Sequence, residues 1–543
     1  MGAADHIYST QTIFLFLLLV VAVFAAVAQR LKLPASIMLV MAGLGISFLP
    51  RVPKIPLNPE LIFLIFLPPL LYVAAWQTNW REFKRNLVSI SMLALGLVGF
   101  TVWGVAIFAD HFITALDYKS GFILGAVVAT TDAIAATSIA RAVGLPQRII
   151  DILEGESLLN DATGLLALEF GLNMLLRDQV PTVGGAALRL LWLIGGGLGV
   201  GLLIGVMTAA VERYVDDGPI EMVVSLVVPY AAYLLAEDVH ASGVLAVVAC
   251  GLFMSRQSVE LFSPAARIQI IGAWGALDFM LNGVVFVLIG LQLPYVMAGI
   301  SNYNWQTLAK YGGAFSAVLI VIRLIWMYPG ATVAWWIRHH WLKQATPRPG
   351  AKEIFVVGWT GMRGVVALAA AISLPETLGN GRPFEQRNLI IFLTFSVILV
   401  TLVVQGLTLP PLIRLLGLGG AGGVDDEELQ ARRTLLEAAV AHLEHGAKGA
   451  MEEEVSHGYE DLLHRYRHRL AVVCDSCHGT PEQERDAVER YRQVSAIALE
   501  TVKVERRVLI SLRNKGEIGD DVLRRLEREL DLTETNAELA EAR

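Results

Sequence analysis

Over its first 415 residues the chain alternates long apolar runs with short polar stretches. The runs are roughly 15–25 residues long, the length that an α-helix needs to cross a bilayer. This pattern predicts an all-α polytopic membrane protein with about thirteen transmembrane helices. The predicted spans are residues 12–29, 35–50, 61–76, 87–109, 120–140, 151–175, 186–211, 220–236, 241–254, 268–291, 308–329, 353–374 and 388–414.

Composition divides the chain into two parts. The whole sequence is 55% hydrophobic and 17% charged, with a net charge of −7. Residues 421–543 hold 27 acidic and 18 basic residues, so the negative charge belongs to this tail, and nothing favours nucleic acid as a partner. We therefore expect a transmembrane domain over 1–415, a glycine-rich hinge over 416–424, and a cytosolic helical domain with a regulatory role over 425–543.

Lysine and arginine in the short loops predict the orientation. With the N-terminus outside, thirteen such residues lie in inner loops and six in outer loops. The first apolar run is preceded by no Lys or Arg and is followed by Arg30 and Lys32, which favours an uncleaved span over a signal peptide. We expect a multi-pass protein of the plasma (cell inner) membrane with a cytoplasmic tail.

Charged residues interrupt three of the predicted spans. Asp132 lies in one, Glu154, Glu156 and Asp161 lie in the next, and Arg363 lies in a late one. Ionisable groups at bilayer depth are costly and typically mark an ion or proton pathway.

Two of these spans also look broken. Thr130 and Thr131 precede Asp132, and three glycines, at positions 358, 361 and 364, surround Arg363. Paired broken helices are typical of a transporter built from two inverted repeats, with an ion site where the breaks cross. The alternative is that the glycines only allow close helix packing.

The helical period brings oxygen-bearing side chains together. Glu154, Ser157 and Asp161 share one helix face, and Glu156 and Asn160 share the adjacent face. Ser157 and Asp161 could bind a monovalent cation, with further oxygens from Asp132 and Thr131. A carboxylate in an apolar site can hold a proton or a cation, but not both, and this competition is the minimum that exchange requires.

Four segments, in this order, resemble the monovalent cation:proton antiporter family in its sodium/proton exchanger branch. They are TTDAIAATSIAR, EGESLLNDATG, LDFMLNGVVFVLIGLQ and GWTGMRGVVALA, and the resemblance covers roughly residues 10–415. The adjacent Asn160 and Asp161 resemble the pair that marks the branch regarded as electroneutral.

The resemblance implies roles for individual residues. Asp161 would alternately bind proton and cation, with Ser157, Asp132 and Thr131 as direct or water-mediated ligands. Asn160 would be a neutral structural partner, and Glu156 and Arg363 would form a buried pair. Other residues would have supporting parts: Asp278 and Asn282 in a polar funnel or in satisfying neighbouring helices, Glu154 in admitting the cation, and Arg323 and Glu169 as structural charges.

The third span departs from the family pattern. Many exchangers carry an acid shortly after the paired prolines of this span, where PPLLYVAAWQ has Val73. The coordination shell and the preference for sodium over potassium therefore stay open.

The tail is predicted to form amphipathic helices, which could pack on one another or dimerise. Its histidines at 442, 445, 457, 464 and 468 could sense pH or simply be solvated. Cys474 and Cys477, with His464 and His468, could bind zinc or be ordinary thiols.

These features predict a secondary antiporter that exchanges Na⁺, or Li⁺ or K⁺, for H⁺ by alternating access and serves pH and cation homeostasis. We expect no enzymatic activity, no cofactor and no metal beyond the transported ion, and the resemblance implies a homodimer in the lipid membrane. The sequence contains no phosphate-binding loop of the GxxxxGK type, which argues against an ATP-driven pump. A sodium-coupled symporter, a K⁺/H⁺ exchanger and a channel remain as alternatives.

Overall fold

The computed structural model describes most of the chain. The described residues are 3–31, 33–49, 59–177, 182–215, 217–262, 264–300, 303–344, 347–378, 382–419 and 424–449, and in the tail also 458–460, 462–467, 469–470, 499–512, 515, 526–527 and 529–535. Contacts divide the chain into two compact units, Met1–Gly420 and Ala421–Arg543.

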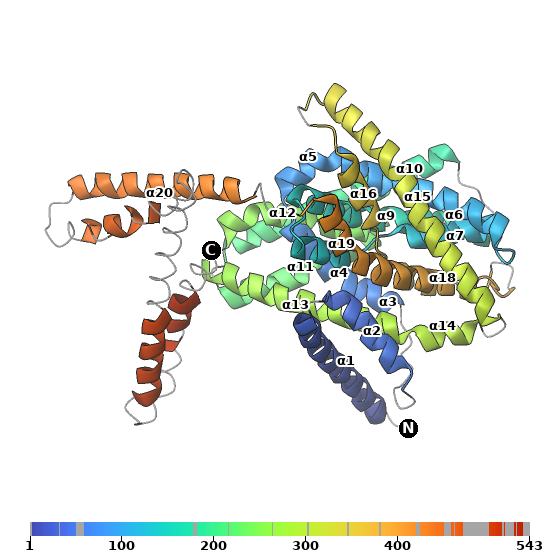
Figure 1. Ribbon diagram of the computed structural model, residues 1–543, viewed down its shortest axis with the longest axis horizontal. Coiled ribbons are helices and arrows are strands. Elements are labelled where there is room, and N and C mark those ends of the chain that lie inside the picture. Colours follow the sequence, from blue (N-terminus) through green and yellow to red (C-terminus); the bar gives the residue numbers. More distant parts are fainter. Residues whose placement is uncertain are drawn as a thin grey trace. The chain divides into compact units, whose positions relative to one another are not determined.

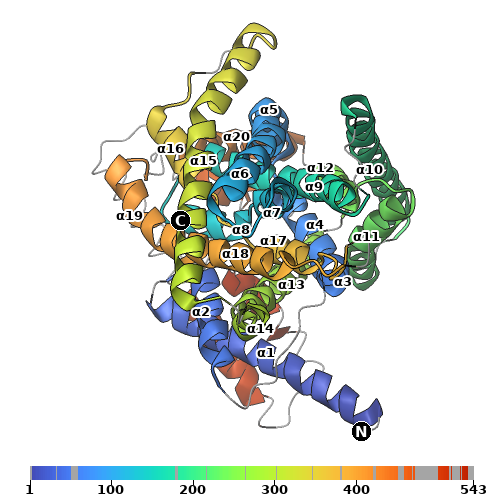
Figure 2. The ribbon, with the colours of Figure 1, turned by 90° about the vertical axis from the view of Figure 1, so that its right-hand side faces the viewer.

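The first unit is built from helices, and its described residues contain only an isolated bridge between Thr377 and Pro383 in place of strands. The predicted all-α class is confirmed. Helix contacts fall into two groups (Figures 1 and 2). The flanking group consists of α1 (Ala3–Leu31), α2 (Ala35–Ser47), the continuous stretch of α3 (Pro59–Leu61), η1 (Ile62–Phe66) and α4 (Leu67–Gln77), then α10 (Val183–Glu212), α11 (Gly218–Asp238), α12 (Gly243–Leu261) and α13 (Pro264–Leu291).

The second group, here the central group, contains both broken helices. α14 (Leu293–Gly299) lies between the two groups in the sequence. The central group consists of α5 (Trp80–Ser91), η2 (Met92–Leu97), α6 (Val98–Phe112), α7 (Tyr118–Ala129), α8 (Ala133–Ala142), α9 (Gln147–Arg177), α15 (Trp305–His340), α16 (Ala351–Trp359), α17 (Val365–Ile372), α18 (Arg387–Val400), η3 (Thr401–Gln405) and α19 (Gly406–Leu416).

Small residues allow close packing inside the flanking group. A Cβ atom on Gly43 of α2 would lie 2.2 Å from the carbonyl oxygen of Val287, and one on Gly290 of α13 would lie 2.3 Å from that of Val40. The backbones of α2 and α13 therefore touch, which is the means by which apolar helices associate where lipid competes for the same surfaces.

The π-helical segment η1 has a clear local cause. Pro68 and Pro69 follow it directly, and a proline has no N–H to donate to a carbonyl one turn earlier. The carbonyl oxygen of Ile65, four residues before Pro69, instead accepts a hydrogen bond from the Tyr230 hydroxyl of α11 at 3.0 Å. This bond joins two helices of the flanking group.

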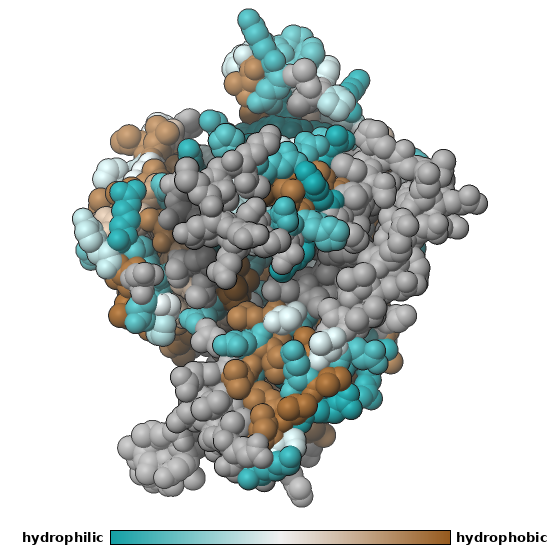
Figure 3. Space-filling view, turned by 90° about the vertical axis from the view of Figure 1, so that its left-hand side faces the viewer, coloured by the Kyte–Doolittle hydropathy of each residue, from teal (hydrophilic) through white to brown (hydrophobic). Residues whose placement is uncertain are grey.

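Eight of the described helices are long and apolar enough to cross a membrane, or nine if α7 and α8 count as one bent span. α2 and part of α12 are shorter apolar helices, and α9, which carries site carboxylates, is not among the eight. The predicted count of thirteen therefore stays a prediction. Hydrophobic side chains gather in patches on the face shown in Figure 3. Independently of that view, α10 exposes Leu188, Leu191 and Leu203 by more than half.

The second unit begins with α20 (Val424–Gly449), which contains the first amphipathic segment predicted for the tail. Arg467 binds Glu444 at 2.7 Å, and Arg506 binds Asp531 at 2.8 Å and also Glu534. The hydrogen bonds that Arg506 donates to Asp531 and Glu534 raise the pKa of its guanidinium. Cys474, Cys477, His457 and His468 lie outside the described residues, and the described part of the chain holds no cluster of metal-ligating side chains.

Candidate functional site

The first helix break lies between α7 and α8. The backbone at Thr130 is extended, and Asp132, also extended, is the N-cap of α8. The Asp132 carboxylate accepts a hydrogen bond from the Ile134 N–H at 2.9 Å. This cap satisfies a backbone donor that the break would otherwise leave without a partner.

The second break, between α16 and α17, crosses the first. The Asp132 N–H donates to the carbonyl oxygen of Met362 at 2.8 Å. A Cβ atom on Gly364, the residue that begins α17, would lie 2.4 Å from the Asp132 carboxylate. The prediction of crossed broken helices is thus confirmed, and the glycine is required here by space.

Helix α9 packs against the first break through two polar side chains. The Ser157 hydroxyl donates to the Thr131 carbonyl oxygen at 2.7 Å. The Asn160 amide donates to the Thr131 hydroxyl at 2.5 Å. Thr131 therefore presents its backbone oxygen and its side chain to α9, and the structure brings three of the predicted site residues into direct contact.

Asp161 lies one turn further along α9 and is buried, with 5% of its surface exposed. One of its carboxylate oxygens, Oδ1, has no hydrogen-bond partner among the described residues. A buried carboxylate oxygen without a partner is costly in a folded protein. A bound cation or a proton would remove that cost.

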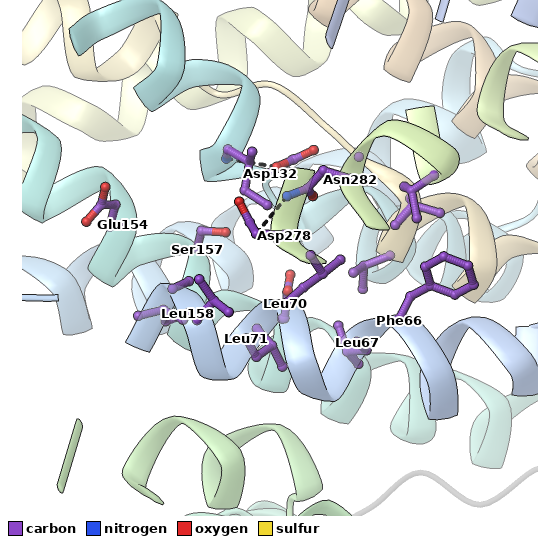
Figure 4. A pocket seen from close by; sticks show the side chains of 18 of the residues that line it. Phe66, Leu67, Leu70, Leu71, Asp132, Glu154, Ser157, Leu158, Asp278 and Asn282 are labelled. Atoms are coloured by element: carbon purple, nitrogen blue, oxygen red, sulfur yellow. Dashed lines mark hydrogen bonds between the residues drawn. The ribbon is translucent and has the colours of Figure 1, made fainter. Parts of the chain in front are cut away.

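A cavity of about 260 Å³ lies at the crossing (Figure 4). Asp132, Ser157 and Asp161 line it on the side of the central group. On the side of the flanking group, α13 contributes Asp278 and Asn282, whose side chains share a 2.9 Å hydrogen bond. The cavity therefore lies where the two helix groups meet.

The part of the wall that α4 supplies is mainly apolar, with Gln77 as its polar member. Leu67, Leu70 and Leu71 of α4 point toward the cavity in Figure 4, and Val73 also lines it. The helix on which many exchangers carry an acid thus presents hydrocarbon here. Among the described residues of the flanking group, Asp278 on α13 supplies the carboxylate that lines the cavity.

Glu156 pairs with a residue other than the predicted one. Arg323 of α15 donates to both Glu156 oxygens, at 2.5 and 2.8 Å, and each side chain is about 1% exposed. Arg323 also donates to the carbonyl oxygens of Val357 and Gly358 at the end of α16. The prediction that Glu156 pairs with Arg363 is therefore wrong. Arg323, which we expected to be only a structural charge, is the residue that neutralises Glu156.

Arg363 instead binds backbone carbonyl groups freed by the two breaks. Its Nε donates to the Val128 oxygen at 3.0 Å, and another nitrogen donates to the Gly361 oxygen. Its own N–H donates to the Thr401 hydroxyl at 3.2 Å. Arg363 thus holds the non-helical backbone of both breaks, as irregular structure at membrane depth requires.

The edge of the cavity carries a second ion pair. Arg141 of α8 donates to Glu154 of α9 at 2.5 Å, and both residues line the cavity. The side chain of Arg141 is about half exposed, which places this pair next to solvent or headgroups. After Glu154 and Glu156 are paired, three acids that line the cavity lack a cationic partner among the described residues: Asp132, Asp161 and Asp278.

This arrangement suits a small cation. The cavity offers carboxylates, the Ser157 hydroxyl and the carbonyl oxygen of Thr131, all gathered around the crossing. Unwound backbone and facing carboxylates are the groups by which transporters coordinate Na⁺ or H⁺. Crossed broken helices around such a cavity define the class of the protein as a secondary transporter for small cations.

The comparisons with known proteins identify the family. The sodium/hydrogen exchanger family, described as transmembrane, matches residues 15–415, so the chain belongs to this family. An uncharacterised Na⁺/H⁺ exchanger from Mycobacterium tuberculosis is 32% identical over 530 residues, covering 95% of each chain. The Na⁺/H⁺ antiporter ApNhaP from Aphanothece halophytica is 33% identical over 76% of this chain and 75% of its own.

The fold is also that of a solved antiporter. The sodium proton antiporter MjNhaP1 from Methanocaldococcus jannaschii matches with a TM-score of 0.58 at 21% identity, over 76% of this chain and 100% of its own. The predicted family is confirmed, and the chain is a multi-pass transporter that exchanges Na⁺ for H⁺.

The pairing of Arg323 with Glu156 was not predicted from the sequence. The signal was available, because an arginine in the middle of the apolar run SAVLIVIRLIWMY must be neutralised by a neighbouring helix. The partner itself could not be identified from spacing, since Glu156 is 167 residues away in the sequence.

Proposed function

We propose that Asp161 is the group that binds Na⁺ and H⁺ in turn, and that exchange is electroneutral with one ion for one proton. The observation that carries this proposal is the buried Asp161 oxygen, beside the crossing of the breaks, for which the described residues supply no hydrogen-bond partner. Ser157, Asp132 and Thr131 would supply further oxygens, and Asn160 would hold Thr131 in place.

Charge pairing around the cavity supports the one-to-one ratio. Glu156 is neutralised by Arg323 and Glu154 by Arg141. Asp161 then carries no net charge whether it holds Na⁺ or a proton. Because both loaded states have the same charge, a membrane voltage does not drive the cycle.

Alternating access would arise from movement between the two helix groups. The cavity lies at their boundary, with Asp132 and Asp161 in the central group and Asp278 in the flanking group. Displacement of one group against the other would open the cavity to one side of the membrane and then to the other. Glu154, which is paired with Arg141 at the edge of the cavity, would admit the cation.

The range of cations is a further part of the proposal. A relative from Bacillus pumilus, 30% identical over 93% of this chain and 75% of its own, is named a sodium, potassium, lithium and rubidium/H⁺ antiporter. Val73 leaves the cavity without an acid from α4, and a site with fewer fixed charges selects less strictly by ion size. We therefore expect K⁺ and Li⁺ to be accepted beside Na⁺.

The setting of the protein completes the proposal. We place the protein in the plasma (cell inner) membrane. The loop charges favour an orientation with the N-terminus outside and the tail in the cytoplasm. A homodimer and a regulatory tail follow from the family resemblance and the composition break at 416–424. In this setting exchange would serve pH and cation homeostasis.

The experiment is cation-driven dissipation of a pH gradient in proteoliposomes, with Na⁺, Li⁺ and K⁺ and with or without an imposed voltage. The proposal predicts exchange with equal rates at zero and imposed voltage. Rates that rise strongly with voltage would contradict electroneutrality. Sodium-dependent uptake of an organic solute would instead support a symporter, and a current beyond carrier turnover would support a channel.

A further inference from the structure

A second cavity lies on the far side of the ion-site helix. It measures about 580 Å³ and is bounded by α5, η2 and α9 of the central group and by α10 and α12 of the flanking group. On α9 it is lined by Leu159, Ala162, Thr163 and Leu166. These residues lie on the face of α9 turned away from Ser157 and Asp161. We call this space the seam cavity.

The lining of the seam cavity is almost entirely hydrocarbon. Two of its hydroxyl groups are already engaged: Thr163 donates to the Leu159 carbonyl at 3.1 Å, and Ser242 accepts from the Leu245 N–H at 3.2 Å. An apolar cavity of about 150 Å³ stays dry and takes up an apolar molecule, so a larger one calls for a larger apolar occupant.

The seam cavity is long and is open at the surface of the helix bundle. From Ser242 to Arg256, both on its wall, α12 rises by roughly 21 Å, which exceeds the thickness of one hydrocarbon leaflet of about 15 Å. Leu95 and Leu202 on opposite walls are 42% and 47% exposed. A linear chain could therefore enter from the bilayer and lie along the cavity.

One end of the seam cavity carries a positively charged side chain, Arg256. Arg256 and Trp80 line it there, where α5 and α12 are in contact. The described residues give Arg256 no ion pair, and its side chain is exposed. Arg81 and Lys84 on the neighbouring turn of α5 are exposed as well. Arginine binds phosphate in a planar, two-pronged geometry, and tryptophan is typical of the headgroup level.

We propose that the seam cavity binds one acyl chain of an anionic phospholipid whose phosphate group contacts Arg256. The chain fills the apolar space behind α9, and the headgroup completes the basic end. Since the occupant lies between the two helix groups, it affects how easily one moves against the other. This consequence for exchange rests on the proposed function, whereas the binding itself does not.

The binding experiment uses the full chain in phosphatidylcholine vesicles containing a trace of phosphatidylglycerol with a photoactivatable group in its acyl chain. Cross-linked residues are mapped by mass spectrometry, and a phosphatidylcholine probe with the same acyl chain is run in parallel. Labels are expected on the cavity faces of α9, α10 and α12. Labels confined to the outer face of α10, or cross-links between two copies through the cavity, would overturn the proposal.

Two variants test the two parts of the site. Arg256→Gln should lower labelling by the anionic probe about fivefold and leave the zwitterionic probe unchanged. Arg213→Gln, at the exposed end of α10 and outside the cavity lining, is the matched control. Ala249→Phe should fill the cavity and abolish labelling by both probes, whereas Val223→Phe, 59% exposed on α11, should not. Labelling that survives Ala249→Phe would contradict the proposal.

Exchange rates separate this proposal from the proposed function. Phosphatidylglycerol should change the exchange rate of the unmodified chain, and Arg256→Gln should remove that dependence. Asp161→Asn should keep full labelling of the seam cavity while losing exchange. An Asp161→Asn variant that still exchanges would refute the transport mechanism and leave the lipid site standing; loss of its labelling would refute the site as described.

Discussion

Glu156 of α9 and Arg323 of α15 form a bidentate ion pair, with donor–acceptor distances of 2.5 and 2.8 Å. Both side chains are buried. The pair joins the ion-site helix to the end of α16, because Arg323 also binds the carbonyl oxygens of Val357 and Gly358. Its position implies a structural role: it fixes α9 relative to the second break without facing the cavity.

Removal of one partner of this pair should destabilise the protein strongly. Glu156→Gln or Arg323→Gln leaves an uncompensated buried charge, at a cost of about 3–5 kcal/mol. The double variant should lose less than the sum of the single losses, because neither charge is then left alone. Thermal-shift measurements on the solubilised variants test this. Additive losses would show that the two residues do not act as a pair.

A methyl group at the crossing should impair exchange. The backbone of Gly364 is extended and open to any residue, so only space opposes Gly364→Ala, whose Cβ would lie 2.4 Å from the Asp132 carboxylate. We expect a loss of exchange of at least tenfold at low Na⁺, through a raised apparent KM, because Asp132 is displaced. Gly313→Ala on α15, where nothing lies within 4 Å, is the control and should exchange normally. Equal rates in both variants would mean that the position of Asp132 does not matter.

An acid introduced on α4 should change the cation affinity. Val73 is buried and lines the ion cavity, so Val73→Glu adds a carboxylate that faces Asp161 and Asp278. The apparent KM for Na⁺ should fall severalfold, because another negative oxygen donor can join the cation. Val73→Gln has nearly the same shape without the charge and should not lower KM. If both variants shift KM alike, charge is not the cause.

The tail should be dispensable for transport itself. All residues proposed to bind the cation precede Gly420, where the contacts divide the chain. A chain truncated after Gly420 should therefore insert and exchange, with an altered response to internal pH if His442, His445 and His464 are regulatory. Vesicle assays at several internal pH values, at matched expression, give the comparison. A folded, inserted truncation without exchange would place part of the mechanism in the tail.

Much of the site could be predicted because the chemistry is local. Ser157, Asn160 and Asp161 belong to one helix, so helical spacing places them close together. Asp132 is the N-cap of the next short helix, and Thr131 comes directly before it. The two breaks likewise follow from charged residues beside glycines and threonines in apolar spans, whereas their crossing was implied by the family resemblance.

Pairings between distant helices could not be predicted in the same way. Both Arg323 and Arg363 are arginines in apolar surroundings, and the sequence gives no rule for which one reaches Glu156. The choice depends on helix rotation and on the carbonyl groups that each break exposes. Arg363 lies close enough to Val128 and Gly361 to be satisfied by backbone oxygens, which leaves Glu156 to Arg323.

We propose that Asp161 holds either a proton or a cation, and replacing its carboxylate removes the group that can do both. Purified Asp161→Asn is reconstituted into proteoliposomes, and dissipation of a pH gradient by Na⁺ is recorded beside the unmodified protein and Asp132→Asn. Asparagine matches a protonated aspartate in shape but cannot trade a proton for a cation. We expect no exchange for Asp161→Asn at unchanged thermal stability, and for Asp132→Asn a raised apparent KM with exchange retained. Sodium-driven proton movement by folded Asp161→Asn at a rate near that of the unmodified protein would show that Asp161 does not carry the exchanged proton.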